Sequence, residues 1–326
     1  MTGPLVAGSV AFAVAVVLTP LFRRLAKRLG WIDKPNERSS HVVPTPRTGG
    51  KAILLGISAG AVATGLWRDA TLLWLLGLAL VLAVLGMIDD AKSLGWRPKF
   101  LVQLAAAVAV LLIPGQWPGP LLAVVAIFWI AGVTNAFNFM DGVNGIAALE
   151  AMICGVVMGL VLLQAGDLTG GLLCFAIAGA AAGFFPWNAF TGSIFMGDVG
   201  SLPLGFLFAA MVVRGVDFGI RPWILALPLL PFLLDTGWTL LRRVARRERI
   251  FEAHRTHSYQ RLTDLGWSHL EVTLLWGGLA AAGGAVALAW EALGALQLIA
   301  SAGLIVLHAV VFAAIAVRHR ELRPAR

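Results

Sequence analysis

Long apolar stretches recur along this chain, and segments rich in charge, glycine or proline separate them. A helix needs about 20 apolar residues to cross the hydrocarbon core of a bilayer, which is about 30 Å thick. Eleven stretches approach that length, near residues 4–22, 50–66, 71–88, 100–113, 120–134, 146–164, 168–185, 201–213, 222–241, 271–289 and 293–316. We therefore expect an all-α, polytopic integral membrane protein with about eleven (10–11) transmembrane helices, and one transmembrane domain over residues 1–326.

The composition excludes other classes of protein. Apolar residues make up 59% of the chain and charged residues 13%. Soluble domains have roughly 45–50% apolar and about 25% charged residues. The two cysteines, Cys154 and Cys174, lie in apolar runs, so we expect neither a disulfide framework nor a cysteine-based metal cluster. The first apolar run has no basic residue before it and four shortly after it, which favours a retained span over a signal peptide.

Lysine and arginine divide unevenly between alternate loops. The set formed by residues 23–51, 89–99, 242–261 and 318–326 carries 22 of the 25, and the other set carries Arg68, Arg214 and Arg221. Cytoplasmic loops of membrane proteins are enriched in these residues. We therefore predict that the basic set is cytoplasmic, with the N-terminus outside and the C-terminus in the cytoplasm. This orientation requires an odd number of spans, which favours eleven.

The polar motifs of the chain also fall on the predicted cytoplasmic side. They are 38-RSSHVVPTPRTGG-50, Asp89-Asp90, 135-NAFNFMDGVNG-145, 195-FMGDVGS-201 and 254-HRTHSYQRL-262. The loops that hold them lie near residues 23–51, 89–99, 135–146, 186–200 and 242–270. Ionisable residues at a membrane boundary are candidates for function, so we expect these segments to form one site.

Asn135, Asn138 and Asp141 recur every third residue and would form a polar stripe at the end of an apolar helix. Helix capping explains one such residue but not three, and the glycines that follow allow a ligand to approach the backbone. Asp198 lies in a second glycine-rich turn, where helix capping is an equally good interpretation. A few hard oxygen ligands with room for water and phosphate are what Mg²⁺ prefers.

Two further groups are charged. Asp89 and Asp90 end an apolar helix, where adjacent carboxylates oppose the helix dipole and repel each other unless a cation or proton neutralises them; a solvated helix end is the alternative. His254, Arg255 and His257 supply cationic and hydrogen-bonding groups for an anion. A basic loop near anionic lipid would explain the arginine but not the paired histidines, and the neighbouring residues do not suit zinc.

Oxygen ligands for a divalent cation and basic side chains for phosphate suit phosphoryl transfer, in which positioning and charge neutralisation do most of the catalysis. A site at the membrane boundary indicates one water-soluble and one lipid-borne phosphate substrate. The sequence has no Walker A motif, so we do not expect nucleotide hydrolysis as an energy source.

The motifs, in this order and at these intervals, resemble those of the polyprenyl-phosphate N-acetylhexosamine-1-phosphate transferases, the family that includes MraY, WecA and TagO. The resemblance extends through nearly the whole chain and rests on 33-DKPNERSSHVVPTPRTGG-50, Asp89-Asp90 with Lys99, NAFNFMDGVNG, FMGDVGS and HRTHSYQRL. The FMDG core and the HRTHSYQ loop are most similar to the WbpL-like O-antigen branch. The resemblance implies that a sugar-1-phosphate passes from a UDP-sugar to undecaprenyl phosphate in a cytoplasmic cleft, releasing UMP and initiating a lipid-linked cell-surface glycan.

The resemblance also implies roles for individual residues. It implies catalytic roles for Asp89, Asp90 and Asp141, metal ligation by Asn138 and Asp198, and substrate binding by Lys99, His41, Asn144, His254, Arg255 and His257. MraY-like members carry aspartate at the position of Asn144, so recognition of the base there stays open.

The implied cofactor is Mg²⁺, with Mn²⁺ as a substitute, and the implied partners are the two substrates and the lipid bilayer. The implied location is the bacterial inner membrane. We expect no nucleic-acid partner, and a homodimer is one expected assembly. The sugar, an N-acetylhexosamine or a 6-deoxy-N-acetylhexosamine, stays open.

Two alternatives remain at this point. A transporter of lipid-linked sugars would place its polar site near the middle of the membrane, between related halves, whereas these polar groups lie at span ends. Another membrane Mg²⁺-dependent phosphotransferase, of the CDP-alcohol type, would carry its aspartates in one run on one helix, whereas this chain distributes them over several loops.

Overall fold

A computed structural model describes residues 2–35, 43–113, 119–249 and 254–322. In these residues the chain is almost entirely helical, and the strands β1 (Ile32–Asp33) and β2 (Thr45–Pro46) form one short antiparallel ribbon. The prediction of an all-α fold is confirmed.

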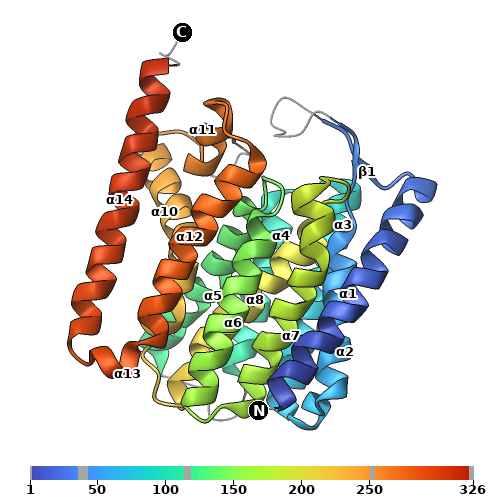
Figure 1. Cartoon of the computed structure of the whole chain (residues 1–326), viewed down its shortest axis with the longest axis vertical. Helices are drawn as coiled ribbons and strands as arrows, with labels where there is room; N and C mark the ends of the chain where they lie inside the picture. The colour runs from blue at the N-terminus through green and yellow to red at the C-terminus, as the bar shows by residue number, and fades with distance from the viewer. Residues whose placement is uncertain (1, 36–42, 114–118, 250–253, 323–326) are drawn as a thin grey trace.

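The long helices follow one another up and down a bundle (Figure 1). They are α1 (Thr2–Leu29), α2 (Gly49–Ala63), α3 (Ala70–Lys92), α4 (Trp96–Leu111), α5 (Pro120–Met140), α6 (Ile146–Gln164), α7 (Leu168–Phe185), α8 (Asp198–Asp217), α10 (Leu230–Ala245), α12 (His269–Leu288) and α14 (Leu296–Leu322). Short elements connect them: η1 (Leu66–Arg68), η2 (Pro186–Phe190), α9 (Pro222–Ala226), η3 (Leu227–Leu229), α11 (Ser258–Asp264) and α13 (Trp290–Leu293).

Nine helical segments of the described chain are long and apolar enough to cross a membrane, with α9, η3 and α10 counted together as Pro222–Ala245. Each falls on a predicted span. The other two predicted spans correspond to α2, with 15 residues, and α4, with 16, which are shorter than the roughly 20 residues that a straight crossing needs. The polytopic membrane fold is therefore confirmed, and the number eleven stays a prediction.

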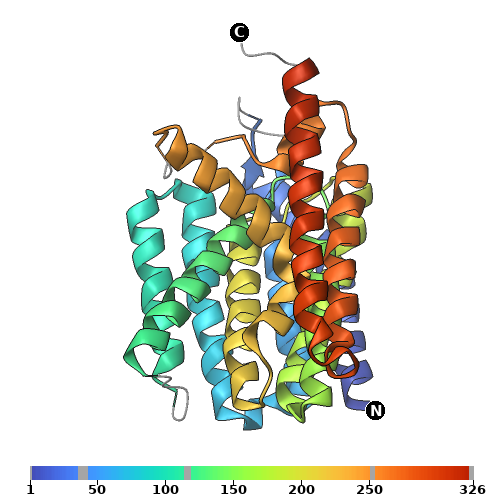
Figure 2. The ribbon, with the colours of Figure 1, turned by 90° about the vertical axis from the view of Figure 1, so that its left-hand side faces the viewer.

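One predicted span is interrupted. The stretch near 222–241 consists of α9, the 3₁₀ turn η3 and α10. Pro228 lies in the turn and Pro231 in the first turn of α10. Proline has no N–H to donate and its ring clashes with the preceding helical turn, so the hydrophobic stretch cannot form one regular helix. Figure 2 shows α10 running obliquely across the bundle, and Figure 1 shows α14 at the edge of the bundle.

Helix α8 is the centre of the bundle. It is buried along nearly its whole length and packs against α2, α3, α5 and α6. Elsewhere small residues let helix backbones touch, as is common in membranes: a Cβ on Gly179 of α7 would lie 2.0 Å from the carbonyl oxygen of Gly8 in α1. At the first turn of α8, a Cβ on Gly50 of α2 would lie 2.3 Å from the backbone nitrogen of Gly200, so α2 packs directly against this turn.

The two ends of the bundle differ. The N-terminus and the C-terminus lie at opposite ends, and β1 and α11 lie at the C-terminal end (Figure 1). At the other end, Arg214 of α8 forms a buried ion pair with Asp167, at 2.6 Å between Nε and Oδ2. Asp167 also caps α7, so this pair ties α7 to α8 away from the polar motifs.

Candidate active site

A cavity of about 990 Å³ opens at the end of the bundle that carries β1 and α11. Segments from distant parts of the sequence form its wall. Eight residues predicted for the site line it: Asp89, Lys99, Asn138, Asp141, Asn144, Asp198, His254 and His257. The structure thus brings four of the five polar motifs together in one cavity, and the fifth motif contributes Arg47.

Three predicted site residues are not in this wall. Asp90 lies behind it, as described below. Arg255 forms an ion pair with Asp264 at 3.1 Å and donates to the hydroxyl of Thr263. His41 lies outside the described residues.

Asp90 caps the first turn of α8. Its carboxylate oxygens accept the backbone N–H groups of Asp198 and Val199, at 3.1 and 3.3 Å. Gly197, with a φ of +74°, turns the chain into this helix. A Cβ on Gly86, one turn before Asp90, would lie 2.3 Å from the carbonyl oxygen of Asp198. Glycine there allows α3 to approach α8 closely enough for the capping interaction.

The backbone between β2 and α2 places Arg47 beside Asp198. The N–H of Phe195 donates to the carbonyl of Pro46 at 2.8 Å, and the N–H of Gly49 donates to the carbonyl of Phe195 at 2.9 Å. Arg47, which lies between these two contacts, was not singled out from the sequence. Its place in the PTPRTGG segment was the available signal.

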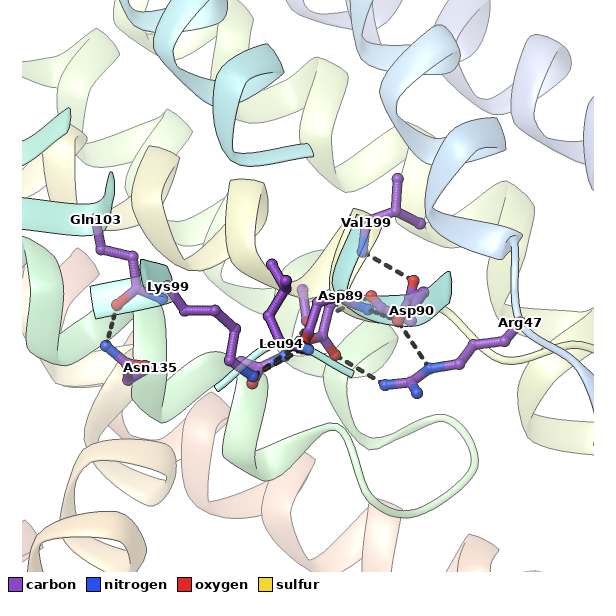
Figure 3. A network of polar contacts seen from close by, with 12 residues as sticks. Arg47, Asp89, Asp90, Leu94, Lys99, Gln103, Asn135 and Val199 are labelled. Carbon is purple, nitrogen blue, oxygen red and sulfur yellow. Dashed lines mark hydrogen bonds and ion pairs between the residues drawn. The ribbon is translucent and has the colours of Figure 1, made fainter. Parts of the chain in front are cut away.

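Cations and carboxylates alternate across this part of the cavity (Figure 3). The guanidinium of Arg47 lies 3.0 Å from Asp90 and 2.8 Å from Asp198. The ammonium of Lys99 lies 2.7 Å from Asp89 and 4.0 Å from the second oxygen of Asp198. Asp198 is therefore flanked by both cations. Burial alone would lower the pKa of Arg47, but the carboxylates of Asp90 and Asp198 outweigh it and raise that pKa, so the guanidinium stays charged.

The amide stripe on α5 joins the cavity to neighbouring helices. Asn135 donates to the side-chain oxygen of Gln103 in α4. Asn138 donates through Nδ2 to the hydroxyl of Ser201 at 2.9 Å, which leaves its carbonyl oxygen as an acceptor. Ser201 lies three residues after Asp198 on α8, so Asn138 and Asp198 belong to the same part of the wall.

Asp141 ends this stripe at the C-terminal cap of α5. Burial raises the pKa of its carboxyl well above the usual range, and the charge of Arg47 only partly opposes this. Asp198 and Asp90 raise it further. Burial therefore favours the protonated form of Asp141 in the free protein.

The loop after Asp141 is fixed by residues that sequence reasoning missed. Asn188, of η2, accepts the backbone N–H of Gly145 at 2.5 Å. His269, at the start of α12, accepts the N–H of Asn144 through Nδ1 at 3.4 Å, and Thr273 donates to the carbonyl of Asn144 at 2.8 Å. Asn188 and His269 also line the cavity. Single polar residues at helix ends gave no signal in the sequence.

The two histidines of the 254–262 segment lie side by side, with ring centroids 5.0 Å apart. His257 is buried, and its Nδ1 lies 3.8 Å from a carboxylate oxygen of Asp235 in α10. Burial lowers the pKa of His254 to about 4, and the charges of His257 and Arg243 act in the same direction. His254 is therefore a neutral hydrogen-bonding group at neutral pH in the free protein.

The donor set of the cavity suits a hard divalent cation better than zinc. No group of three or more His, Cys, Asp or Glu side chains among the described residues could hold a metal ion by itself. The carboxylate of Asp198 and the amide oxygen of Asn138 are hard ligands in a roomy cavity. Mg²⁺ commonly takes one or two protein carboxylates and completes its shell with water and substrate phosphates, so these residues fit that ion.

The fold and the cavity together define a polytopic membrane protein with a charged, partly enclosed site suited to phosphate groups. Residues 72–216 match the family described as glycosyl transferase family 4, and the chain belongs to this family.

Named relatives cover most of the chain. A decaprenyl-phosphate N-acetylglucosaminephosphotransferase of Mycobacterium tuberculosis is 31% identical over 85% of this chain and 81% of its own length. An undecaprenyl-phosphate alpha-N-acetylglucosaminyl 1-phosphate transferase of Yersinia pestis is 26% identical over 78% of this chain and 75% of its own length. A phospho-N-acetylmuramoyl-pentapeptide-transferase of Geobacillus kaustophilus is 35% identical over 64% of this chain and 74% of its own length. The family resemblance predicted from the motifs is thus confirmed, the chain is an enzyme rather than a transporter, and the WbpL-like branch stays a prediction.

Proposed function

We propose that this enzyme transfers a sugar-1-phosphate from a UDP-sugar to undecaprenyl phosphate and releases UMP. The observation that carries the proposal is the position of Asp198, between Arg47 and Lys99 in the wall of a cavity that also contains His254 and His257. Alternating charges of this kind can hold two phosphate-bearing substrates close together, which the transfer requires. The family and the names of the relatives support the same reaction.

The proposal assigns the cation to the cavity wall at α5 and α8. Asp198 and Asn138 would hold Mg²⁺, or Mn²⁺ in its place, and the ion would draw negative charge from the diphosphate of the donor. Arg47 keeps Asp90 and Asp198 in place and adds positive charge beside the Asp198 carboxylate.

Lys99 and Asp89 are assigned to the phosphates. The ammonium group of Lys99 forms an ion pair with Asp89 at 2.7 Å. Asp89 also accepts the backbone N–H of Leu94 at 2.6 Å, and this fixes the carboxylate and with it the ammonium group. A phosphate oxygen can then approach the remaining N–H donors of Lys99. Asp89 thereby orients Lys99 toward the reacting phosphates.

The reaction itself is proposed as direct attack. An oxygen of the lipid phosphate forms a bond with the sugar-linked phosphorus, and the bond from that phosphorus to the bridging oxygen breaks, so that UMP leaves with the electron pair. A phosphate monoester is largely ionised at neutral pH because its second pKa is about 6, so no general base has to remove a proton from it.

The two substrates are proposed to enter from different sides. Trp96, Phe100, Phe128, Ala131 and Gly132 of α4 and α5 form an apolar part of the cavity wall, and the side chain of Phe128 is 62% exposed on the surface of the bundle. An isoprenoid chain can reach the polar groups there from the bilayer. The histidines lie on the other side, beside α11, and are proposed to bind the UDP part of the donor.

The test is the release of UMP by purified enzyme from a panel of UDP-sugars with undecaprenyl phosphate. We expect turnover with at least one UDP-N-acetylhexosamine, its loss with EDTA, its return with Mg²⁺ or Mn²⁺, and less than a few per cent of it in Asp198→Ala. Glu321→Ala is the matched control, because it removes an exposed carboxylate at the end of α14. Turnover in Asp198→Ala equal to that of the control, or a phosphorylated enzyme formed with UDP-sugar alone, would contradict the mechanism.

A further inference from the structure

Asp235 is a fully buried carboxylate that does not line the cavity. It lies on α10, and its two oxygens accept the backbone N–H groups of Ser258 and Tyr259, at 2.7 and 3.1 Å. Burying a carboxylate is costly unless hydrogen bonds compensate it. Both donors lie in α11, so the two hydrogen bonds compensate the buried charge and fix the position of α11 relative to α10.

Tyr259 continues this connection on the other side of α11. It is fully buried, and its hydroxyl donates to the carbonyl of Phe139 at 2.9 Å. A Cβ on Gly142 would lie 2.1 Å from the same hydroxyl oxygen. The hydroxyl is therefore in tight contact with the segment that holds Asn138 and Asp141.

Each end of the connection adjoins a residue assigned to the site, His257 at one end and Asn138 at the other. His257 directly precedes Ser258, and its ring stacks on that of Tyr259 with centroids 5.7 Å apart. Phe139 directly follows Asn138. A shift of α11 would therefore change the distance between His257 and the Asn138–Asp141 segment, and displacements of about 1 Å in such sites can cost on the order of 100-fold in rate.

We propose that Asp235 and Tyr259 are positioning residues which, through α11, set the distance between His257 and the Asn138–Asp141 segment and so determine how the donor nucleotide is bound. This inference rests on the proposed function for its kinetic consequence. Its structural part, the link from Asp235 to the segment after Asn138, can be measured independently.

Tyr259→Phe is the most specific variant, because it removes one hydroxyl and keeps the buried ring. We expect the KM for the UDP-sugar and the Kd for UDP to rise about tenfold, which corresponds to the loss of about one hydrogen bond. The KM for undecaprenyl phosphate should stay near that of the wild type, whereas the melting temperature should fall slightly, because the carbonyl of Phe139 loses a hydrogen bond. Thr19→Val is the matched control, since it removes a buried hydroxyl that donates within α1, to Ala15 at 2.6 Å. Kinetic constants equal to those of the control would overturn the proposal.

Asp235→Asn tests the other end, because an amide offers one acceptor oxygen where the carboxylate offers two. We expect the same kinetic change. The double variant should lose less than the product of the two single losses, because both act through α11. If the loss in the double variant equals the product of the two single losses, Asp235 and Tyr259 act independently and the proposal is contradicted.

Tyr259 is the only tyrosine of the chain, so labelling with 3-fluorotyrosine gives a ¹⁹F signal from this residue alone. We expect Asp235→Asn to shift this signal, and Tyr259→Phe to speed amide hydrogen exchange in residues 139–145 of the unlabelled protein. If these changes occur but wild-type enzyme transfers no sugar phosphate, the proposed function fails and the connection stands. If wild-type enzyme is active but neither change occurs, the connection fails.

Discussion

Asp90 holds Asp198 in place by accepting the backbone N–H of that residue at 3.1 Å. The resemblance to the family implied a catalytic role for Asp90, and the structure places it behind the cavity wall. Its two neighbours in the network, Arg47 and the first turn of α8, both depend on its charge.

Asp89 and Asp90 should therefore respond differently to substitution. Asp90→Ala leaves two backbone N–H groups and part of Arg47 without an acceptor, and an unsatisfied buried donor costs about 1–3 kcal/mol. We expect a lower melting temperature together with a loss of activity. Asp89→Ala should lose activity with a smaller change in melting temperature, because it leaves one backbone N–H, that of Leu94, without an acceptor and its other partner Lys99 faces the cavity. Equal melting temperatures for the two variants would contradict the assignment.

Arg47 should not be replaceable by lysine. Its planar guanidinium contacts Asp90 and Asp198 at the same time, whereas an ammonium group is a single point charge without that fork. We expect Arg47→Lys to lower kcat at least tenfold and Arg47→Ala to lower it further. Arg318→Lys, at the exposed end of α14, should leave turnover unchanged. Full activity in Arg47→Lys would show that the enzyme does not need the paired contacts of this guanidinium.

His254 should make stability depend on pH. Its pKa is about 4 in the folded protein, where burial is the main cause, against the usual 6.5. The unfolded chain therefore binds more protons between these values, and stability falls as pH falls from about 6.5 toward 4. We expect the melting temperature of wild type minus that of His254→Gln to decrease between pH 7.5 and pH 5. An unchanged difference would show that His254 is not held neutral.

The predicted orientation in the membrane can be tested with introduced cysteines. Both native cysteines are buried, so the background reaction with a membrane-impermeant maleimide should be low. In intact cells we expect Arg68→Cys, at an exposed position in η1, to react, and Trp267→Cys, an exposed residue before α12, to react only after the membrane is opened. The reverse labelling pattern would show that the protein has the opposite orientation in the membrane.

Much of the fold follows from the hydrophobic pattern alone. Apolar runs located the long helices, because a bilayer demands a minimum length, and the uneven distribution of basic residues grouped the polar motifs on one side. The β1–β2 ribbon was not predicted, since strands of two residues leave no periodic pattern. The break at Pro228 and Pro231 was overlooked because the surrounding residues are apolar throughout.

The site could be predicted only in part. Asp198 and Asn138 stand out because their segments combine polar residues and glycine at unusual spacing, and His257 stands out because it is paired with His254. Arg47 and Tyr259 act through contacts with residues more than 100 positions away in the sequence. Such contacts depend on how the helices pack, and no local pattern encodes them.

Asp198 and Asn138 are proposed to share one divalent cation. Binding of Mn²⁺ to purified enzyme in the presence of UDP, followed by electron paramagnetic resonance, tests it most directly. We expect about one bound ion per chain, with at least tenfold weaker binding in Asp198→Asn and in Asn138→Ala, and unchanged binding in Glu321→Ala. Wild-type affinity in Asp198→Asn or in Asn138→Ala would show that the two residues do not share a cation.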